Sequence, residues 1–280
     1  MFAELEAFLA RLATERAVLV TVGSTRGSVP RESGAWMAVF PTAMGGVIGT
    51  IGGGHLEWDA LRQAREALAR PPQAAPATWE HAVVLGPSLG QCCGGALVLR
   101  FEMVDCAHAE ALRQRLVSGC VPLALFGGGH VGRALVQALT PLPFDVTWID
   151  SRDEVFPQNV PVHVRTEHSD PVQAAVRDLA AGSRVLVMSF SHAEDLDIVA
   201  ACLLRLRERA DLGFIGLIGS ATKWATFRSR LRQRGFSDDE LARVTCPIGL
   251  PGITGKQPAV IAAAVVAQLL LDAQADPGGG

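Results

Sequence analysis

A glycine-rich turn between a predicted strand and a predicted helix is the feature that most constrains the fold of this chain. The apolar run 123–126 is followed by Gly127, Gly129 and Gly132 in the spacing Gly-x-Gly-x-x-Gly. In this spacing the first glycine permits a tight turn, the second lets backbone approach a phosphate, and the third lets the helix pack on the strand. Asp150 ends the next predicted strand, where a ribose-hydroxyl acceptor is expected. We therefore predict a Rossmann-like fold around this turn.

The rest of the second half alternates between short apolar runs and amphipathic segments. The predicted strands cover residues 123–126, 145–149, 162–164, 184–189 and 213–218. The predicted helices cover residues 131–139, 171–181, 193–210, 222–234 and 258–273. Strands that alternate with helices are typical of a doubly wound parallel sheet, so we assign this half to the α/β class.

The first half mixes predicted hairpins with helices. Helices are predicted over residues 2–16 and 56–69, and strands over 17–22, 35–40, 47–51, 81–85 and 96–102. This pattern predicts a smaller α+β domain built on a mixed sheet. The expected organisation is a first domain over 1–104, a linker helix over 105–120, a Rossmann-like domain over 121–275 and a disordered tail over 276–280.

Composition and charge exclude several classes of protein. The chain has 280 residues, of which 49% are hydrophobic and 19% charged, and this composition is incompatible with intrinsic disorder. Its net charge of −3 gives no basic footprint for nucleic acid and no polybasic membrane patch. The longest apolar run, 259–271, is shorter than a membrane span, and the N-terminus lacks the features of a signal peptide. We expect a cytoplasmic protein that binds neither nucleic acid nor membrane.

An adjacent cysteine pair, Cys92 and Cys93, lies between Gln91 and Gly94. The six cysteines of the chain are too scattered for a disulfide framework, and none has zinc-site spacing. Two neighbouring cysteines in a glycine-rich loop cannot both point into one core, so at least one thiol is expected to be accessible. Thiolates are soft ligands for metals. Two small apolar residues, or a vicinal disulfide, are the alternatives that the sequence leaves open.

Two other loops carry residues suited to anions. Gly53, Gly54 and His55 lead into a predicted helix in the same order as the later turn; they indicate either glycine dihedrals at a helix start or a second anion-binding helix terminus. The polar segment 23–31 contains two arginines and several hydroxyls and suits a phosphate or carboxylate, unless it is a solvated connection. His130 stands within the later turn, where its side chain either crowds a pyrophosphate or contacts another group.

These motifs together resemble the xanthine dehydrogenase accessory protein family, the XdhC and CoxI family, over nearly the whole chain. The resemblance is carried by residues 27–37, 49–58, 85–95, 125–135 and 146–152. Segment 91–95 is the most discriminating, and it resembles the branch that serves xanthine dehydrogenase. The chain departs from the family at 258–262, where relatives often carry an acidic residue, so no role for that carboxylate is transferred.

The resemblance implies an accessory protein rather than an enzyme. Such a protein binds molybdenum cofactor, holds it during sulfuration of the molybdenum and delivers it to apo-xanthine dehydrogenase, with a cysteine desulfurase as sulfur donor; it also implies a homodimer. The metal-side contacts would be Cys93 first and Cys92 second, an order that the sequence leaves open. The remaining candidate cofactor contacts are Gln91, Gly94, Gly127, Gly129, His130, Gly132, Asp150, Gly53, Gly54 and His55.

Three alternatives are kept. An NAD(P)-dependent oxidoreductase would use the Gly127–Gly132 turn and Asp150, but it leaves the adjacent cysteines without a role. An adaptor would dock on the dehydrogenase and the desulfurase without holding cofactor. A thiol redox sensor would use Cys92 and Cys93 alone. The sequence also leaves open whether the glycine turn binds the cofactor phosphate, a separate nucleotide or nothing.

Overall fold

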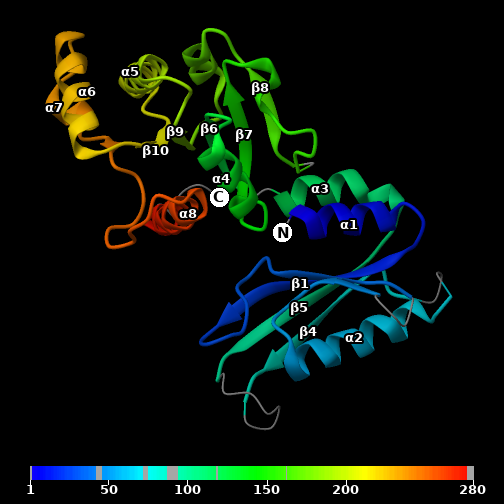
Figure 1. Cartoon of the computed structure of the whole chain (residues 1–280). Helices are drawn as coiled ribbons and strands as arrows, with labels where there is room; N and C mark the ends of the chain where they lie inside the picture. The colour runs from blue at the N-terminus through cyan, green and yellow to red at the C-terminus, as the bar shows by residue number, and fades with distance from the viewer. Residues whose placement is uncertain are drawn as a thin grey trace. The chain divides into compact units, whose positions relative to one another are not determined.

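The computed structural model describes residues 2–41, 46–71, 75–86, 94–117, 119–161 and 163–275. The chain divides into two compact units, Met1–Ser118 and Gly119–Gly280, which we describe separately (Figure 1). The predicted tail 276–280 lies outside the described residues, as do Gln91, Cys92 and Cys93. Among the described helices, none combines the length and the apolar character that a bilayer-crossing span requires.

The first unit is a five-stranded sheet with helices on both faces. Its elements are α1 (Phe2–Leu12), β1 (Ala17–Arg26), β2 (Trp36–Val39), β3 (Val47–Gly49), α2 (Gly54–Leu68), β4 (Thr78–Val84), β5 (Ala96–Val104), the 3-10 turn η2 (Cys106–His108) and α3 (Ala109–Val117). The strand order is β3-β2-β1-β5-β4. All four pairings are antiparallel, so the prediction of a mixed sheet was wrong. Helix α2 is a crossover, but it joins β3 to β4 at opposite edges and creates no parallel neighbours.

Strand β1 is buried on both faces, which explains its continuous apolar sequence. Val18 and Val20 pack in the cluster that contains Leu56 of α2, whereas Leu19 packs with Phe8 of α1 on the other face. Figure 1 shows α1 and α3 on one side of this sheet and α2 on the other. Beyond a register shift between Val22 and Ser24, β1 continues to Arg26, so part of the predicted polar loop 23–31 is strand.

Segment 105–120, expected as a linker, contributes helix α3 to the core of the first unit. Leu112 of α3 is buried in the same cluster as Leu5 and Phe8 of α1. The boundary between the two units falls at Ser118 and Gly119.

The second unit is a six-stranded parallel sheet. Its elements are β6 (Val121–Phe126), α4 (His130–Leu139), β7 (Phe144–Asp150), η3 (Asp153–Val155), β8 (Arg165–His168), η4 (Val172–Asp178), β9 (Ser183–Val187), α5 (His192–Arg209), β10 (Leu212–Leu217), α6 (Ala221–Gln233), α7 (Asp238–Leu241), β11 (Val244–Thr245) and α8 (Pro258–Ala275). The order β11-β10-β9-β6-β7-β8 is that of a doubly wound Rossmann-like sheet, as predicted. The strand order reverses between β6 and β9, which is therefore the switch point.

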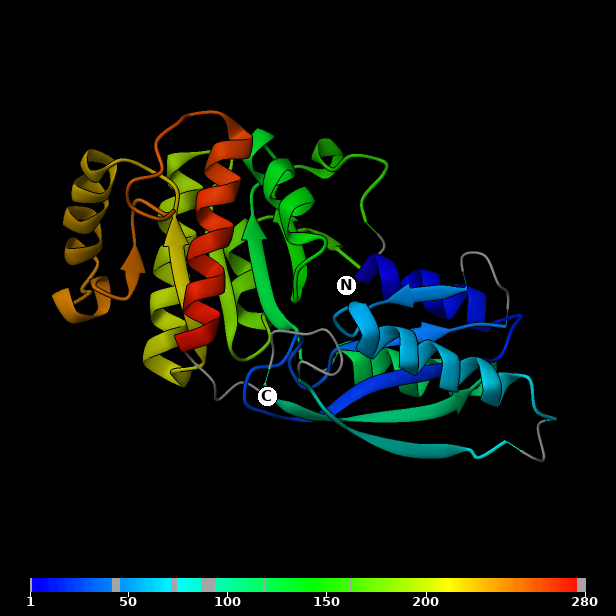
Figure 2. The same ribbon diagram turned by 90° about the horizontal axis from the view of Figure 1, so that it is seen from below.

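Both faces of this sheet are covered by helices. Leu135 of α4 and Val265 of α8 pack in one cluster, whereas Val199 of α5 and Val176 of η4 pack in the other. Figure 2 shows α8, in red, lying along one face of the sheet beside α4. The sheet is thus buried on both sides, as parallel sheets require.

Two predicted elements of the second unit differ from the structure. The strand expected at 162–164 lies at Arg165–His168, an edge strand of exposed polar residues that hydropathy does not mark; Val162 lies outside the described residues. The helix expected at 171–181 is the shorter 3-10 helix η4. Arg205 explains its end, because its guanidinium donates to the carbonyl oxygens of Val176 and Leu179 and so replaces the hydrogen bonds of a longer helix.

Candidate functional site

The glycine turn of the second unit joins β6 to α4 at the switch point of the sheet. Gly127 has φ +125°, and a Cβ atom there would collide with the carbonyl oxygen of Met188, at the end of β9. A Cβ atom on Gly132 would collide with the carbonyl oxygen of Gly127. These two glycines are therefore required for the contacts of the turn with β9 and of α4 with the turn.

The two middle glycines of the turn differ in accessibility. Gly128 is buried, and a Cβ atom on it would lie 2.6 Å from Cγ1 of Val155. Gly129 is exposed, has open space around it and is the N-cap residue of α4. The side chain of His130, which begins α4, is also exposed. A ligand can therefore approach this turn at Gly129 and His130, where helix N–H groups point outward.

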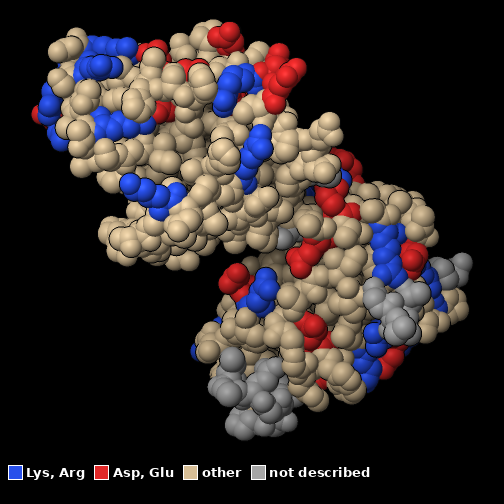
Figure 3. All heavy atoms as spheres, in the orientation of Figure 1, with Lys and Arg blue, Asp and Glu red and all other residues tan. Residues whose placement is uncertain are grey.

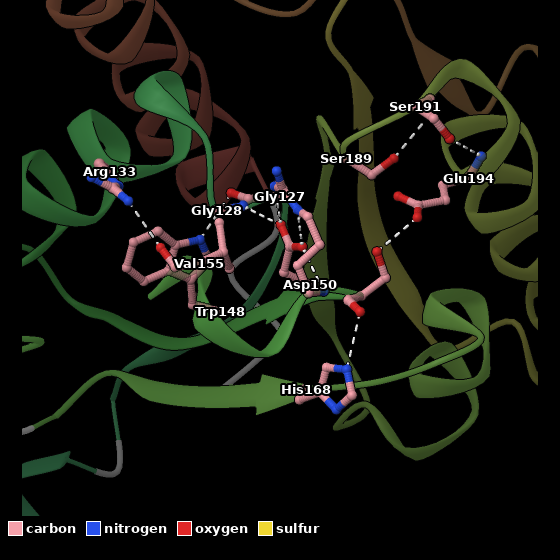
Figure 4. Close-up of polar contacts among 12 residues, drawn as sticks. Gly127, Gly128, Arg133, Trp148, Asp150, Val155, His168, Ser189, Ser191 and Glu194 are labelled. Carbon is pink, nitrogen blue, oxygen red and sulfur yellow. Dashed lines mark hydrogen bonds and ion pairs between the residues drawn. The ribbon is translucent and has the colours of Figure 1, made fainter. Parts of the chain in front are cut away.

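Asp150 lies at the end of β7 with only 2% of its surface exposed, and it is fully engaged within the protein (Figure 4). Its Oδ2 accepts from the backbone N–H of Gly128 at 2.6 Å and from Nη2 of Arg152 at 2.9 Å. Its Oδ1 accepts from the backbone N–H of Arg152 at 3.0 Å and from Nε of Arg152 at 2.8 Å. Four donors fill the acceptor capacity of a carboxylate.

The hydrogen bonds to Asp150 favour its ionised form. Burial alone would raise the pKa of Asp150, but the hydrogen bonds from Arg152 and Gly128 outweigh burial and lower the pKa below its ordinary value. The carboxylate therefore stays ionised and remains paired. In this arrangement it has no free lone pair for ribose hydroxyls.

Ser151 and Arg152 connect the end of β7 to the β9–α5 segment. The hydroxyl of Ser151 donates to Oε1 of Glu194 at 2.7 Å. The guanidinium of Arg152 lies over the ring of Phe190, 4.5 Å from its centroid. Together with Asp150, which bonds to Gly128, three consecutive residues thus contact the glycine turn, α5 and the β9–α5 loop. Figure 4 shows the hydrogen bonds of Asp150 and Glu194 at the carboxyl end of β7.

A buried ion pair joins the start of α5 to the start of α6, next to the carboxyl ends of β9 and β10. Asp195 of α5 and Lys223 of α6 are 2.6 Å apart, with side chains 3% and 12% exposed. Asp195 also accepts from the backbone N–H and the hydroxyl of Ser189, each at 2.8 Å. These contacts position the β9–α5 loop that carries Phe190.

The glycine run 52–54 of the first unit adopts positive φ angles where helix α2 begins. Gly52, Gly53 and Gly54 have φ values of +120°, +72° and +62°. Oε2 of Glu57 accepts from the hydroxyl of Thr50 at 2.6 Å and from the backbone N–H of Gly53 at 3.1 Å. The start of α2 thus already has an anion from its own chain. His55, on the first turn of α2, stacks on exposed Trp58 instead of facing this loop's N–H groups.

Three of the glycine-rich segments meet at one end of the first unit. A Cβ atom on Gly95 would collide with the carbonyl oxygen of Ser28, and one on Gly52 would lie 2.6 Å from Cβ of Pro30. The loop that contains Ser28 and Pro30 is therefore packed between the start of α2 and the start of β5. The side chains of Arg26, at the end of β1, and of Arg31, on this loop, are exposed. Gly94, which directly follows Cys93 in the sequence, is exposed and has open space around it.

Three of the four other thiols are poor ligands because burial holds them in the neutral form. Burial raises the pKa of Cys120 and Cys246 to about 11 and that of Cys202 to about 12. Cys106 is exposed. Across the described ranges, no group of three or more His, Cys, Asp or Glu side chains is arranged to hold a metal ion.

Thiol titration is expected to isolate the adjacent cysteines. At pH 8 a thiol with a pKa of about 11 is ionised in about one molecule in a thousand, so Cys120, Cys202 and Cys246 should not react in the native protein. In a Cys106→Ser variant, any fast reaction with a disulfide reagent would then come from Cys92 and Cys93. Fast thiols in a variant that lacks Cys92, Cys93 and Cys106 would contradict this expectation. A vicinal disulfide would appear as fast thiols released only by reductant.

Comparison with known families decides the membership of the chain. The family described as the XdhC Rossmann domain matches residues 123–269, more than half of the chain. The family described as XdhC and CoxI matches residues 10–75. The chain belongs to the XdhC and CoxI family. The predicted resemblance is thus confirmed, and in this XdhC-family protein the glycine turn, Asp150 and Arg152 all lie within the matched Rossmann domain.

Relatives of this XdhC-family protein include one curated sequence and one solved structure with full coverage. The uncharacterized protein YqeB of Escherichia coli (strain K12) is 29% identical over 264 residues, which are 93% of this chain and 44% of YqeB. The chain therefore spans less than half the length of that relative. The crystal structure of a xanthine dehydrogenase from Bacillus halodurans has a TM-score of 0.74 at 20% identity and covers 99% of this chain and 97% of that chain. This likeness shows a shared fold.

The sequence analysis did not identify the residues that bond to the predicted site residues and their neighbours. Arg152 donates hydrogen bonds to the carboxylate of Asp150, and Glu57 accepts a hydrogen bond from the backbone N–H of Gly53 in the glycine run. Both have a sequence signal: an arginine two residues after the strand-ending acid, and a glutamate in the first turn of a glycine-led helix. Glu194 and Phe190 have no such signal, because their partners lie about 40 residues away in the chain.

Proposed function

We propose that this protein serves the maturation of xanthine dehydrogenase by carrying molybdenum cofactor as its cargo. It holds the cargo while a terminal sulfido ligand is installed on the molybdenum and then delivers it to apo-xanthine dehydrogenase. A cysteine desulfurase supplies the sulfur, and the carrier acts as a homodimer in the cytoplasm. In this role it is an accessory protein, and none of its residues is catalytic. Membership of the XdhC and CoxI family supports the maturation role.

The observation that carries the proposal is an open glycine turn without a free ribose acceptor. A site for NAD needs both N–H donors for the pyrophosphate and a carboxylate for the ribose. Here Gly129 and His130 are exposed at the start of α4, but Asp150 is filled by Gly128 and Arg152. A pterin cofactor with a single phosphate needs only the helix terminus. The turn therefore favours the cargo's phosphate over NAD, and an NAD-dependent oxidoreductase has less support.

The metal end of the cargo is assigned to the adjacent cysteines. Thiolates are soft ligands and suit molybdenum or its sulfur, so Cys93 is the first candidate contact and Cys92 the second. Gln91 and Gly94 belong to the same loop. The exposed and open position of Gly94 supports access to this end of the first unit. Gly53, Gly54 and His55 stay the other candidate contacts of the first unit. Because Glu57 already satisfies the N–H of Gly53, we propose no anion there.

Cofactor loading tests this function. The purified full chain would be incubated with molybdenum cofactor, freed of unbound ligand and analysed for molybdenum and oxidised pterin. We expect near-stoichiometric loading of the wild type and of Cys106→Ala, the matched control for loss of an exposed thiol. Cys93→Ala should lose loading because it removes the metal-side ligand, with Cys92→Ala as the second test. Loading by none of these proteins would refute the carrier and favour an adaptor.

A second variant tests the phosphate end. Gly129→Asp places a carboxylate at the N-cap of α4, where there is open space for a side chain and where aspartate is a favoured cap. The variant should stay folded and bind the cargo about 10-fold or more weakly, because the new carboxylate competes for the N–H donors. Unchanged loading by Gly129→Asp would remove the glycine turn from the site. Saturable NAD binding by the wild type, lost in Gly129→Asp, would support the oxidoreductase instead.

A further inference from the structure

Phe190 is an exposed aromatic ring at the switch point of the Rossmann sheet. Its side chain is 67% exposed, although the residues on either side of it are fixed. Ser189 is bonded to Asp195, and the hydroxyl of Ser191 caps α5 by accepting from the backbone N–H of Glu194. A rigid backbone thus presents an open ring at the sheet edge where ligands bind in this fold. With the guanidinium of Arg152 4.5 Å from its centroid, the ring is suited to stacking against a planar ligand.

Glu194 brings an unsatisfied acceptor to the same sheet edge. Its Oε1 accepts from Ser151, but its Oε2 is buried and has no hydrogen-bond partner among the described atoms. Hydrogen bonds to Asp150 raise the pKa of Arg152, and the charge of Glu194 adds to the rise, so Glu194 lies within electrostatic reach of the guanidinium. A buried acceptor without a donor is unfavourable, and a ligand N–H would satisfy it.

The contacts of residues 150–152 place these groups around one surface. Asp150 bonds to the glycine turn, Ser151 bonds to Glu194, and Arg152 lies over Phe190. We define the switch-point surface as Gly129, Arg152, Phe190 and Glu194. It combines a helix terminus for an anion, an aromatic face and a carboxylate. Within the protein, the ring of Phe190 contacts the guanidinium of Arg152 and is otherwise largely exposed, and Oε2 of Glu194 has no hydrogen-bond partner among the described atoms.

We propose that the switch-point surface binds the pteridine ring of the cargo, with Phe190 against the face of the ring and Oε2 of Glu194 accepting from its N–H edge. A pterin carries a 2-amino group beside a ring N–H, which is the edge that a carboxylate recognises. Guanine carries the same edge, and a guanine nucleotide is therefore the competing source of this chemistry. The inference rests on the proposed function for the choice of pterin, and it assigns the selectivity of the site to Phe190 and Glu194.

Ligand pairs and variants test this assignment in the full chain. Pterin and lumazine differ at position 2, where lumazine has a carbonyl in place of the amino donor, and their binding would be followed by fluorescence anisotropy. The wild type should prefer pterin by about 10-fold or more, because a carbonyl faces the carboxylate of Glu194 unfavourably. Glu194→Gln should bring this preference close to one, which a merely structural role would not do. Phe190→Ala should lower the affinity for both ligands by about 10- to 100-fold.

The control and the possible outcomes separate this inference from the proposed function. Trp58→Ala removes another exposed aromatic ring, on α2 of the first unit, and should leave the affinity for both ligands unchanged. If Phe190→Ala and Glu194→Gln bind pterin as the wild type does while the cargo still loads through Cys93, the inference is overturned and the carrier stands. If pterin binding depends on both residues but no molybdenum loads, the carrier fails and the inference stands. Guanosine binding at least as tightly as pterin would overturn the pterin assignment.

Discussion

Gly132→Ala is expected to destabilise the second unit by roughly 4 kcal/mol or more, an effect opposite in sign to the usual one. In an exposed helix, alanine in place of glycine stabilises by about 1 kcal/mol. At Gly132, however, the new methyl group would collide with the carbonyl oxygen of Gly127. That oxygen also accepts from Nε1 of Trp148 at 2.9 Å, so moving it would break a buried hydrogen bond. Helix α4 must therefore move away from the turn.

Thermal unfolding followed by circular dichroism would measure this effect. For a unit of this size, the expected loss lowers Tm by about 10 °C or more. Gly129→Ala is the matched control, because a Cβ atom on Gly129 meets nothing within 4 Å and its φ of −72° suits any residue. Its Tm should stay within a few degrees of the wild type. Equal stability of Gly132→Ala and Gly129→Ala would show that α4 is not packed against the turn as described.

Lys223→Met is expected to cost about 3–5 kcal/mol, because it leaves the buried carboxylate of Asp195 without its cation. The two side chains are 2.6 Å apart and 3% and 12% exposed. Ser189 would continue to donate to Asp195 but would not neutralise its charge. The β9–α5 loop, and with it Phe190, should loosen as a result.

Denaturant unfolding of a double-mutant cycle would measure this pair. Asp195→Asn combined with Lys223→Met should cost less than the sum of the single changes, because no unpaired charge is left buried. Arg234→Met is the matched control, since the pair of Arg234 and Asp197 also joins α5 to the end of α6 but is 45% and 40% exposed. Exposed pairs contribute about 0–1 kcal/mol. A cost for Lys223→Met no larger than that for Arg234→Met would refute the role given to burial.

Local pattern was sufficient to predict most of the second unit. The alternation of apolar strands and amphipathic helices was correct for the strands β6, β7, β9 and β10 and for the helices α4, α5, α6 and α8. It failed at β8, where an edge strand has one partner and needs no apolar face. It also failed at η4, because Arg205, about 30 residues later in the chain, takes the carbonyl oxygens that end it. Both failures come from contacts that no local window contains.

In the candidate site too, the sequence predicted some features and the tertiary structure decided others. The spacing of Gly127, Gly129 and Gly132 after an apolar strand determined the turn, since the steric limits on φ and on close packing act on the sequence itself. Family membership could also be read from the sequence motifs. Only the tertiary structure decided that Asp150 also accepts from the backbone N–H of Gly128 and that the exposed ring of Phe190 lies beside Arg152. The sequence determines which groups are present and their local geometry, whereas the partners of a charged or aromatic side chain depend on which distant elements the fold brings within a few ångströms.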